Sequence, residues 1–212
     1  MTSAKICGLS TPEGVQAALG GGAAFIGFMF FDASPRRVSP DTAGRLAAPA
    51  RGKTRIVAVT VDPDDAALDR IMAALKPDLI QLHGRETPAR AREIGRRTGA
   101  GLIKVLPVAT ASDVDAAAAY DGLVDHLMFE TKPAADAERP GGNGLAFDWS
   151  LIAGRRFERP HFIAGGLDPW NVADAVRVSG APLVDVSSGV ERGAGLKDPA
   201  LISAFLDAVA RA

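Results

Sequence analysis

The sequence has little cysteine, few histidines and no excess of either charge. Its 212 residues include one cysteine, so no intramolecular disulfide can form, and three scattered histidines without the spacing of a zinc site. Lys and Arg number 24 against 25 Asp and Glu, which gives a formal net charge of −1. Nucleic acids and anionic membranes attract proteins with a concentrated basic excess, so neither is predicted as a partner.

Long hydrophobic runs and a secretion signal are also missing. No apolar run reaches the roughly 18–20 residues of a membrane span. The first ten residues, MTSAKICGLS, lack the charged-then-apolar pattern of a signal peptide. Hydrophobic residues make up 47% of the chain and charged residues 23%, which is typical of a globular protein. We therefore expect a soluble, cytoplasmic protein.

Short apolar runs rich in Ile, Val, Leu and Phe recur at a steady interval, as expected for strands buried on both faces. We predict eight strands, at Ala4–Cys7, Phe25–Phe30, Arg55–Thr60, Leu79–Leu82, Leu102–Val105, Leu123–Phe129, His161–Ala164 and Leu183–Ser187. Ala-rich amphipathic stretches lie between most of them, with proline at or near the start, where its missing N–H costs least. They predict helices at Pro12–Leu19, Pro40–Ala48, Pro63–Leu75, Pro88–Arg97, Pro169–Arg177 and Pro199–Arg211, with weaker signals at Ser112–Ala119 and Phe147–Ala153.

Alternation of strand and helix predicts an α/β fold with parallel strands and right-handed crossovers. Eight units of about 26 residues predict one domain over residues 1–212, a (β/α)8 TIM barrel smaller than the roughly 250 residues typical of that fold. A doubly wound open sheet is the alternative. It normally has fewer strands, and the dinucleotide fingerprint that would favour it is absent after the first strand.

Polar groups recur at the ends of the predicted strands, where a barrel carries its chemistry. Cys7 ends the first strand, Arg36 follows the second, His83 follows the fourth and Glu130 ends the sixth. Each has a simpler explanation when taken alone: Cys7 as a small buried hydrophobe, Arg36 and Glu130 as solvated charges, and His83 as a cap or surface group. His126 and His161 fall within strands, and we interpret both as structural.

Glycine-rich loops after the seventh and eighth strands give the most specific signal. Barrels commonly bind phosphate there, because glycine lets backbone N–H groups approach an anion and a following helix adds a favourable dipole. These loops contain Gly165, Gly166, Ser187, Ser188 and Gly189, and Asp168-Pro169 predicts the start of a helix directly after the first loop. A third loop, Gly141–Gly144, is a weaker signal. The alternative is that these glycines only form turns.

Several segments, in this order, resemble the phosphoribosylanthranilate isomerase family of tryptophan biosynthesis. The matching segments are Lys5–Leu9, Ile26–Phe28, Ser34–Arg36, Gln81–Gly84, Gly141–Gly144 with Phe147–Trp149, Ala164–Leu167 and Asp185–Glu191. No single segment is specific for this family. The combination of KICG, QLHG and VDVSSGVE, spread over the whole chain in that order, is specific.

The resemblance implies a barrel without cofactor or metal that catalyses an Amadori rearrangement. N-(5-phosphoribosyl)anthranilate becomes 1-(2-carboxyphenylamino)-1-deoxyribulose 5-phosphate, with an acid protonating the ring oxygen and a base removing the C2′ proton. The resemblance assigns the base to Cys7 and the acid to Glu130. It further assigns the anthranilate carboxylate to Arg36 and supporting substrate contacts to His83 and Asp185. The phosphate is assigned to Gly142, Gly144, Gly165, Gly166, Ser187, Ser188 and Gly189.

Glu130 departs from the family pattern, which usually has Asp-x-Lys where this chain has Glu130-Thr131-Lys132. The acid is kept on a side chain one methylene longer, so full activity would need the strand end or the loop to shift. Asp125 is an alternative acid, but it has the opposite strand parity to Glu130, and the Thr-Lys-Pro that follows places the motif on Glu130.

Two other functions remain open from the sequence. One is the aldose–ketose isomerisation of histidine biosynthesis, which generally uses two aspartates at strand ends. The other is a non-catalytic barrel that binds a phosphorylated ligand. In each case we expect a small phosphorylated molecule as the partner, and a monomer rather than a dimer.

Overall fold

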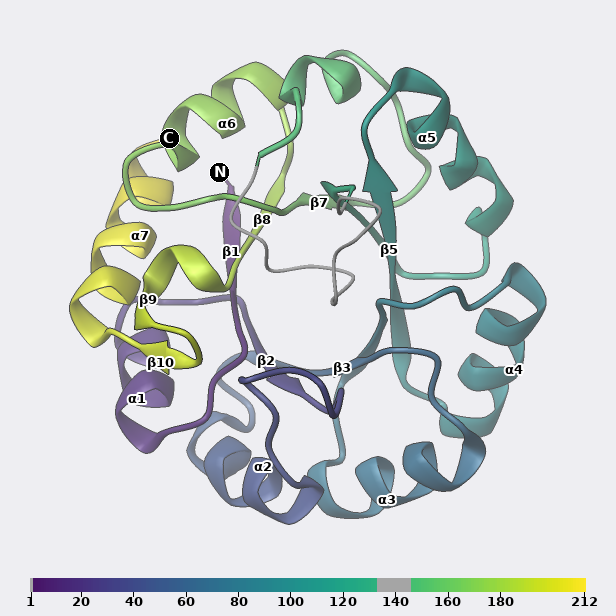
Figure 1. Cartoon of the computed structure of the whole chain (residues 1–212), viewed down its shortest axis with the longest axis vertical. Helices are drawn as coiled ribbons and strands as arrows, with labels where there is room; N and C mark the ends of the chain where they lie inside the picture. Colours follow the sequence, from purple (N-terminus) through teal and green to yellow (C-terminus); the bar gives the residue numbers. More distant parts are fainter. Residues whose placement is uncertain (1, 133–145) are drawn as a thin grey trace.

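Eight parallel strands pair in chain order and close into a barrel, because the first strand also pairs with the eighth (Figure 1). The computed structural model describes residues 2–132 and 146–212. The barrel strands are β1 (Ser3–Cys7), β2 (Phe25–Met29), β3 (Arg55–Thr60), β4 (Leu79–Leu82), β5 (Gly101–Val108), β6 (His126–Thr131), β7 (His161–Ile163) and β8 (Leu183–Val186). The predicted (β/α)8 barrel is confirmed, while the assignment of all of residues 1–212 to one domain stays a prediction.

Helices surround the barrel on its outer side (Figure 1). The α-helices are α1 (Pro12–Gly20), α2 (Pro40–Ala47), α3 (Asp65–Leu75), α4 (Pro88–Thr98), α5 (Ala111–Asp115), α6 (Val172–Ser179) and α7 (Pro199–Arg211). Short 3-10 helices are η1 (Ala48–Ala50), η2 (Ala116–Tyr120), η3 (Trp149–Ile152) and η4 (Ser188–Val190). Among the described helices, none is long and apolar enough to cross a membrane.

Proline and a capping side chain begin most of the long helices. In α1, α2, α4 and α7 a proline occupies the first turn, and the preceding Thr11, Ser39, Thr87 or Asp198 accepts a backbone N–H of that turn. Both features satisfy or remove donors that have no partner within the helix. The starts of these helices were therefore predictable from local sequence.

Two hydrophobic cores result from the alternation of side chains along each strand. The larger lies between strands and helices, and the smaller fills the barrel with side chains that include Phe25, Val57, Met128 and Phe162. Cys7 belongs to this inner core. Residues of the same parity near the carboxyl ends of the strands therefore point into the barrel mouth.

Several predicted boundaries differ from the observed ones, chiefly at the fifth and sixth strands and at the helix after the seventh strand, and one small sheet was missed. The sixth strand was predicted at Leu123–Phe129 but runs from His126 to Thr131, because Leu123 belongs to a turn and β5 offers partners up to Val108. The helix predicted from Pro169 begins only at Val172. The missed sheet is a hairpin of β9 (Glu191–Gly193) and β10 (Leu196–Lys197) after β8.

The late start of α6 has a local cause. The Asp168 carboxylate accepts the backbone N–H groups of Trp170 and Asn171 at 2.8 and 2.9 Å, and the Asn171 side chain returns a bond to Gly166 O at 2.8 Å. An aspartate that bonds the backbone two residues on forms a turn in competition with helix. Residues 168–171 are therefore part of the loop after β7.

Candidate active site

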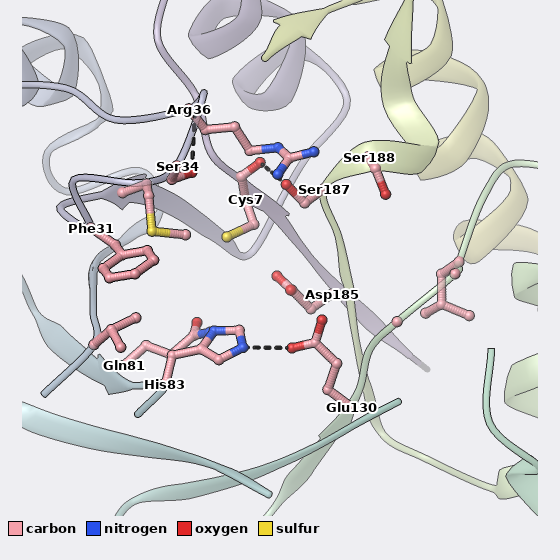
Figure 2. A pocket seen from close by; sticks show the side chains of 15 residues that line it. Cys7, Phe31, Ser34, Arg36, Gln81, His83, Glu130, Asp185, Ser187 and Ser188 are labelled. Carbon is pink, nitrogen blue, oxygen red and sulfur yellow. Dashed lines mark hydrogen bonds and ion pairs between the residues drawn. The ribbon is translucent and has the colours of Figure 1, made fainter. Parts of the chain in front are cut away.

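One pocket at the carboxyl end of the barrel gathers most of the predicted site residues (Figure 2). The empty space between its side chains, open solvent included, is about 670 Å³. Its lining includes Cys7, Arg36, His83, Glu130, Gly165, Gly166, Asp185, Ser187 and Ser188. Gly142 and Gly144, also predicted to bind phosphate, lie outside the described residues.

Cys7 ends β1 and points into this pocket with only 4% of its surface exposed. Burial raises the pKa of its thiol, because a thiolate loses solvation there; Lys5 opposes this shift and Asp185 adds to it. The Ser187 hydroxyl donates to the Cys7 carbonyl at 3.2 Å, which ties the end of β1 to the loop after β8. The end of β1 is therefore held in place, while burial disfavours the thiolate form of Cys7.

Glu130 lies in the last part of β6 and is 7% exposed. Its Oε2 is 2.8 Å from Nε2 of His83, across the pocket from Cys7 (Figure 2). The amide of Gln81 lies 3.2 Å from the other ring nitrogen, Nδ1. The imidazole of His83 therefore lies between the Gln81 amide and the Glu130 carboxylate.

The backbone of β6 is regularly paired at the position of the longer acid. Glu130 pairs with Pro107 and Thr131 with Val108 in the same parallel register that runs from His126. The register of β6 is therefore regular through its last residue, and whether the strand end or the loop is shifted relative to the family stays a prediction. Asp125, the alternative acid, lies at the opposite end of β6, where its carboxylate accepts the backbone N–H of Leu102 at 2.7 Å.

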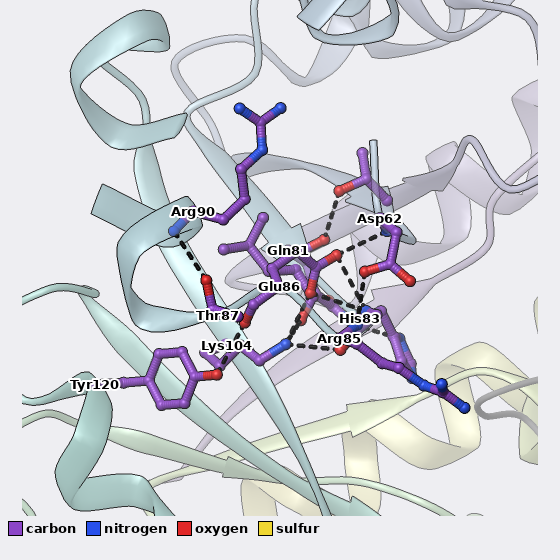
Figure 3. Close-up of polar contacts among 12 residues, drawn as sticks. Asp62, Gln81, His83, Arg85, Glu86, Thr87, Arg90, Lys104 and Tyr120 are labelled. Atoms are coloured by element: carbon purple, nitrogen blue, oxygen red, sulfur yellow. Dashed lines mark hydrogen bonds and ion pairs between the residues drawn. The ribbon is translucent and has the colours of Figure 1, made fainter. Parts of the chain in front are cut away.

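A buried ion pair fixes the loop that carries His83 (Figure 3). Glu86 and Lys104 are each 3% exposed, with Nζ and Oε2 2.7 Å apart. The Glu86 carboxylate also accepts the N–H groups of Gly84 and Asp62, and Lys104 donates to the carbonyls of Leu82 and Gly84. Because these bonds hold the backbone on both sides of His83, they set the position of the imidazole beside Glu130.

Arg36 is tied to a neighbouring carboxylate. It is 5% exposed, and its Nε and Nη2 donate to the two oxygens of Glu191 at 2.7 and 2.9 Å. Lys197 donates to the same carboxylate at 2.6 Å and to the Ser187 carbonyl at 2.8 Å. Within the described part of the chain, the Nη1 group of Arg36 has no acceptor, so it is the part of the guanidinium left for a ligand.

The two glycine loops of the predicted phosphate site touch each other. Gly165 and Gly166 have φ values of +84° and +65°, a backbone region that side chains disfavour. A β-carbon on Gly189 would overlap the carbonyl of Leu167, so the loop after β8 packs directly on the loop after β7. The pocket side of this junction carries Ser187 and Ser188. Backbone and hydroxyl groups thus converge at one edge of the pocket.

Sequence reasoning missed Lys5, Gln81 and Glu191 as parts of the site. Lys5 and Gln81 have a readable signal, since each precedes a predicted site residue by two positions and so shares its face of the strand. Glu191 has no such signal, because its partner Arg36 is 155 residues away. Among residues 2–132 and 146–212, no cluster of three or more His, Cys, Asp or Glu side chains could hold a metal.

Comparisons with known proteins agree with the geometry. The family profile described as N-(5'phosphoribosyl)anthranilate (PRA) isomerase matches residues 4–208. The N-(5'-phosphoribosyl)anthranilate isomerase of Caulobacter sp. (strain K31) is 66% identical, with all of both chains covered. A phosphoribosyl anthranilate isomerase solved in complex with reduced 1-(o-carboxyphenylamino)-1-deoxyribulose 5-phosphate is 29% identical, with a TM-score of 0.84 and full coverage of both chains. Monomers generated from the dimeric Thermotoga maritima isomerase give 30% identity, the same TM-score and full coverage.

Proposed function

This chain belongs to the N-(5'-phosphoribosyl)anthranilate isomerase family, and on that premise we propose that Cys7 and Glu130 are the base and the acid of its reaction. It is an isomerase of the aldose–ketose kind in tryptophan biosynthesis. The substrate is N-(5-phosphoribosyl)anthranilate and the product 1-(2-carboxyphenylamino)-1-deoxyribulose 5-phosphate. The observation that carries the assignment is that a thiol and a carboxyl group from β1 and β6 line the same pocket as the two glycine loops.

Glu130 acts first, by giving its proton to the furanose ring oxygen. The C1′–O bond breaks, the anilino nitrogen supplies its electron pair, and a protonated Schiff base forms. The His83 imidazole, 2.8 Å from Oε2, holds the carboxyl group in one orientation and stabilises the carboxylate that the step leaves behind.

Cys7 then removes the C2′ proton as a thiolate. The C–H electron pair forms the C1′–C2′ double bond, and the Schiff base becomes an enolamine. In the tautomerisation that follows, C1′ gains a proton and the C2′ hydroxyl loses one, so the overall reaction neither consumes nor releases protons.

Both ends of the substrate are anions, and different kinds of donor hold them. Arg36 holds the anthranilate carboxylate through Nη1, while Glu191 keeps the rest of the guanidinium fixed. The phosphate lies against the loops of Gly165, Gly166 and Ser187–Gly189, where the short distance between loops favours backbone N–H contacts. Gly142 and Gly144 complete this assignment as a prediction from the family motif.

Substitution of the two proposed catalytic residues tests the proposal. Cys7→Ser should abolish most turnover while product-analogue binding stays nearly unchanged, because a hydroxyl is a far poorer base than a thiolate. Glu130→Gln should reduce turnover by about 10²- to 10⁴-fold, the usual contribution of general acid catalysis. Full turnover by either variant would contradict the corresponding role. Rescue of a tryptophan auxotroph that lacks the isomerase distinguishes a catalyst from a mere binder, and an assay with the histidine-pathway substrate checks that rival activity.

The oligomeric state stays a prediction. Light scattering on the purified chain would distinguish the expected monomer from a dimer.

A further inference from the structure

Lys5 is a fully buried lysine inside the barrel that the proposed reaction leaves without a role. It precedes Cys7 by two residues on β1, so both side chains point into the barrel, one layer apart. An ammonium group is costly to bury, so a buried lysine that keeps its charge needs a charge partner.

Asp185 is that partner. It lies beside Lys5 on β8, in register with it, and its Oδ1 is 2.7 Å from Nζ. Burial alone lowers the pKa of Lys5, but the charges of Asp185 and Cys7 outweigh burial, so the pKa lies above its ordinary value. Lys5 therefore stays protonated throughout the pH range in which the enzyme works.

The neighbouring strand leaves space for Lys5 to reach the thiol as well. Gly27 pairs with Cys7 on β2 and carries no side chain. A β-carbon there would lie 3.2 Å from both the Cys7 sulfur and the Lys5 Nζ, so the two groups flank the same small space. The ammonium group of Lys5 thus contacts a carboxylate on one side and faces the thiol on the other.

We propose that Lys5 is a positioning residue for the proposed base: its ammonium group stabilises the Cys7 thiolate, and Asp185 holds that ammonium group in place. The thiol gives its proton to water before the substrate binds, and the resulting thiolate takes the C2′ proton. Lys5 itself transfers no proton. The inference rests on the proposed role of Cys7.

The other charges near the pocket are either weaker in effect on the thiol or already paired. The groups that face Cys7 from the surrounding elements are Lys5, Asp185, Lys197 with Glu191, Arg36 with the same Glu191, and Glu130 with His83. After burial, Lys5 has the largest effect on the pKa of the Cys7 thiol and lowers it. Asp185 acts in the opposite direction, and Lys197 lowers the pKa by a smaller amount. Removal of the Lys5 charge should therefore raise the pKa of the Cys7 thiol, and removal of the Asp185 charge should lower it.

The single cysteine of the chain makes the test direct. The rate of alkylation by iodoacetamide, measured against pH by intact-mass analysis, reports Cys7 alone. Lys5→Met should move the midpoint of this profile up by about one to three pH units, the usual effect of a close opposite charge. Below both midpoints, alkylation would then be about 10- to 1,000-fold slower. Asp185→Asn should move the midpoint down.

The double variant Lys104→Met with Glu86→Gln is the matched control, because it removes another buried, ion-paired lysine of the barrel together with the charge of its partner, and neither group acts on Cys7. Its alkylation midpoint should equal that of the wild type. A folded Lys5→Met protein with an unchanged midpoint would overturn the inference. If Lys5→Met does not fold, Lys5→Gln decides, because its amide keeps a polar partner for Asp185 but carries no charge; an unchanged midpoint in that variant contradicts the inference.

Turnover separates this inference from the role of Cys7 as base. The rising limb of kcat/KM against pH should follow the alkylation midpoint in each variant. If the alkylation midpoint shifts but the rising limb of kcat/KM against pH does not, the thiolate is not the base, and the proposed function is refuted. Unshifted alkylation beside an inactive Cys7→Ser protein refutes only the role of Lys5.

Discussion

Shortening the proposed acid, by Glu130→Asp, tests whether the site is built for a glutamate. One carbon–carbon bond of about 1.5 Å is removed, so the 2.8 Å separation between Oε2 and His83 Nε2 would widen to about 4 Å, beyond hydrogen-bond reach. The β6 register is regular through Thr131, so no strained backbone is available to relax and restore the contact.

The expected loss follows from that displacement. A misplacement of about 1 Å costs about 10²-fold in rate, which corresponds to about 2.7 kcal/mol of transition-state stabilisation. Because the substrate-binding loops are untouched, we expect kcat to fall and KM to change little. The family's usual residue is thus predicted to be worse in this chain.

Steady-state kinetics of wild type, Glu130→Asp and Glu130→Gln over pH measure the effect. His83→Asn provides a matched comparison, since it removes the partner while keeping the glutamate. If Glu130→Asp equals or exceeds the wild type, the contact with His83 has no part in catalysis, and the longer acid is merely tolerated.

Three further outcomes are expected. Burial lowers the pKa of His161 to about 4. As the pH drops, the unfolded chain therefore protonates this histidine before the folded chain does. The free energy of unfolding should fall by about 2 kcal/mol between about pH 6.5 and about pH 4, a figure reduced to allow for the partial exposure of the side chain. Urea unfolding at pH 7 and pH 4.5 measures the loss of unfolding free energy on acidification. This loss should be about 2 kcal/mol smaller in His161→Leu than in the wild type, and an equal loss in both proteins would contradict the lowered pKa of His161. Glu86→Gln should destabilise the fold by about 3–5 kcal/mol, because it leaves Lys104 buried without its counter-ion; urea unfolding at pH 7 measures this, and an unchanged midpoint and slope would show that the pair is dispensable. Gly189→Ala should raise KM for the phosphorylated substrate, because the new β-carbon overlaps the carbonyl of Leu167 and separates the two loops; a KM equal to that of wild type would remove Gly189 from the phosphate site.

Much of the fold was predictable because its signals are local. A proline with a capping Thr or Ser before it marks a helix start wherever it occurs, as at Pro12 and Pro88. Buried parallel strands need continuous apolar runs, and all eight were found. The prediction failed where a local competitor overrode the pattern. The Asp168 carboxylate forms a turn in place of the first turn of α6, and pairing with β5 extends β6 beyond its apolar part.

The candidate site divides in the same way. Strand ends and family motifs placed Cys7 and Glu130 at one rim from the sequence, because parallel strands of a barrel present their carboxyl ends together. The partners of these groups needed the tertiary structure. Lys5 meets Asp185 across 180 residues of chain, and the contact between His83 and Glu130 depends on the loop that Glu86 holds. Patterns that extend over only a few residues determine which side chains lie at the mouth of the barrel, so the sequence alone specifies them. Only closure of the barrel decides which charges become neighbours, because that proximity arises between strands and not along the chain.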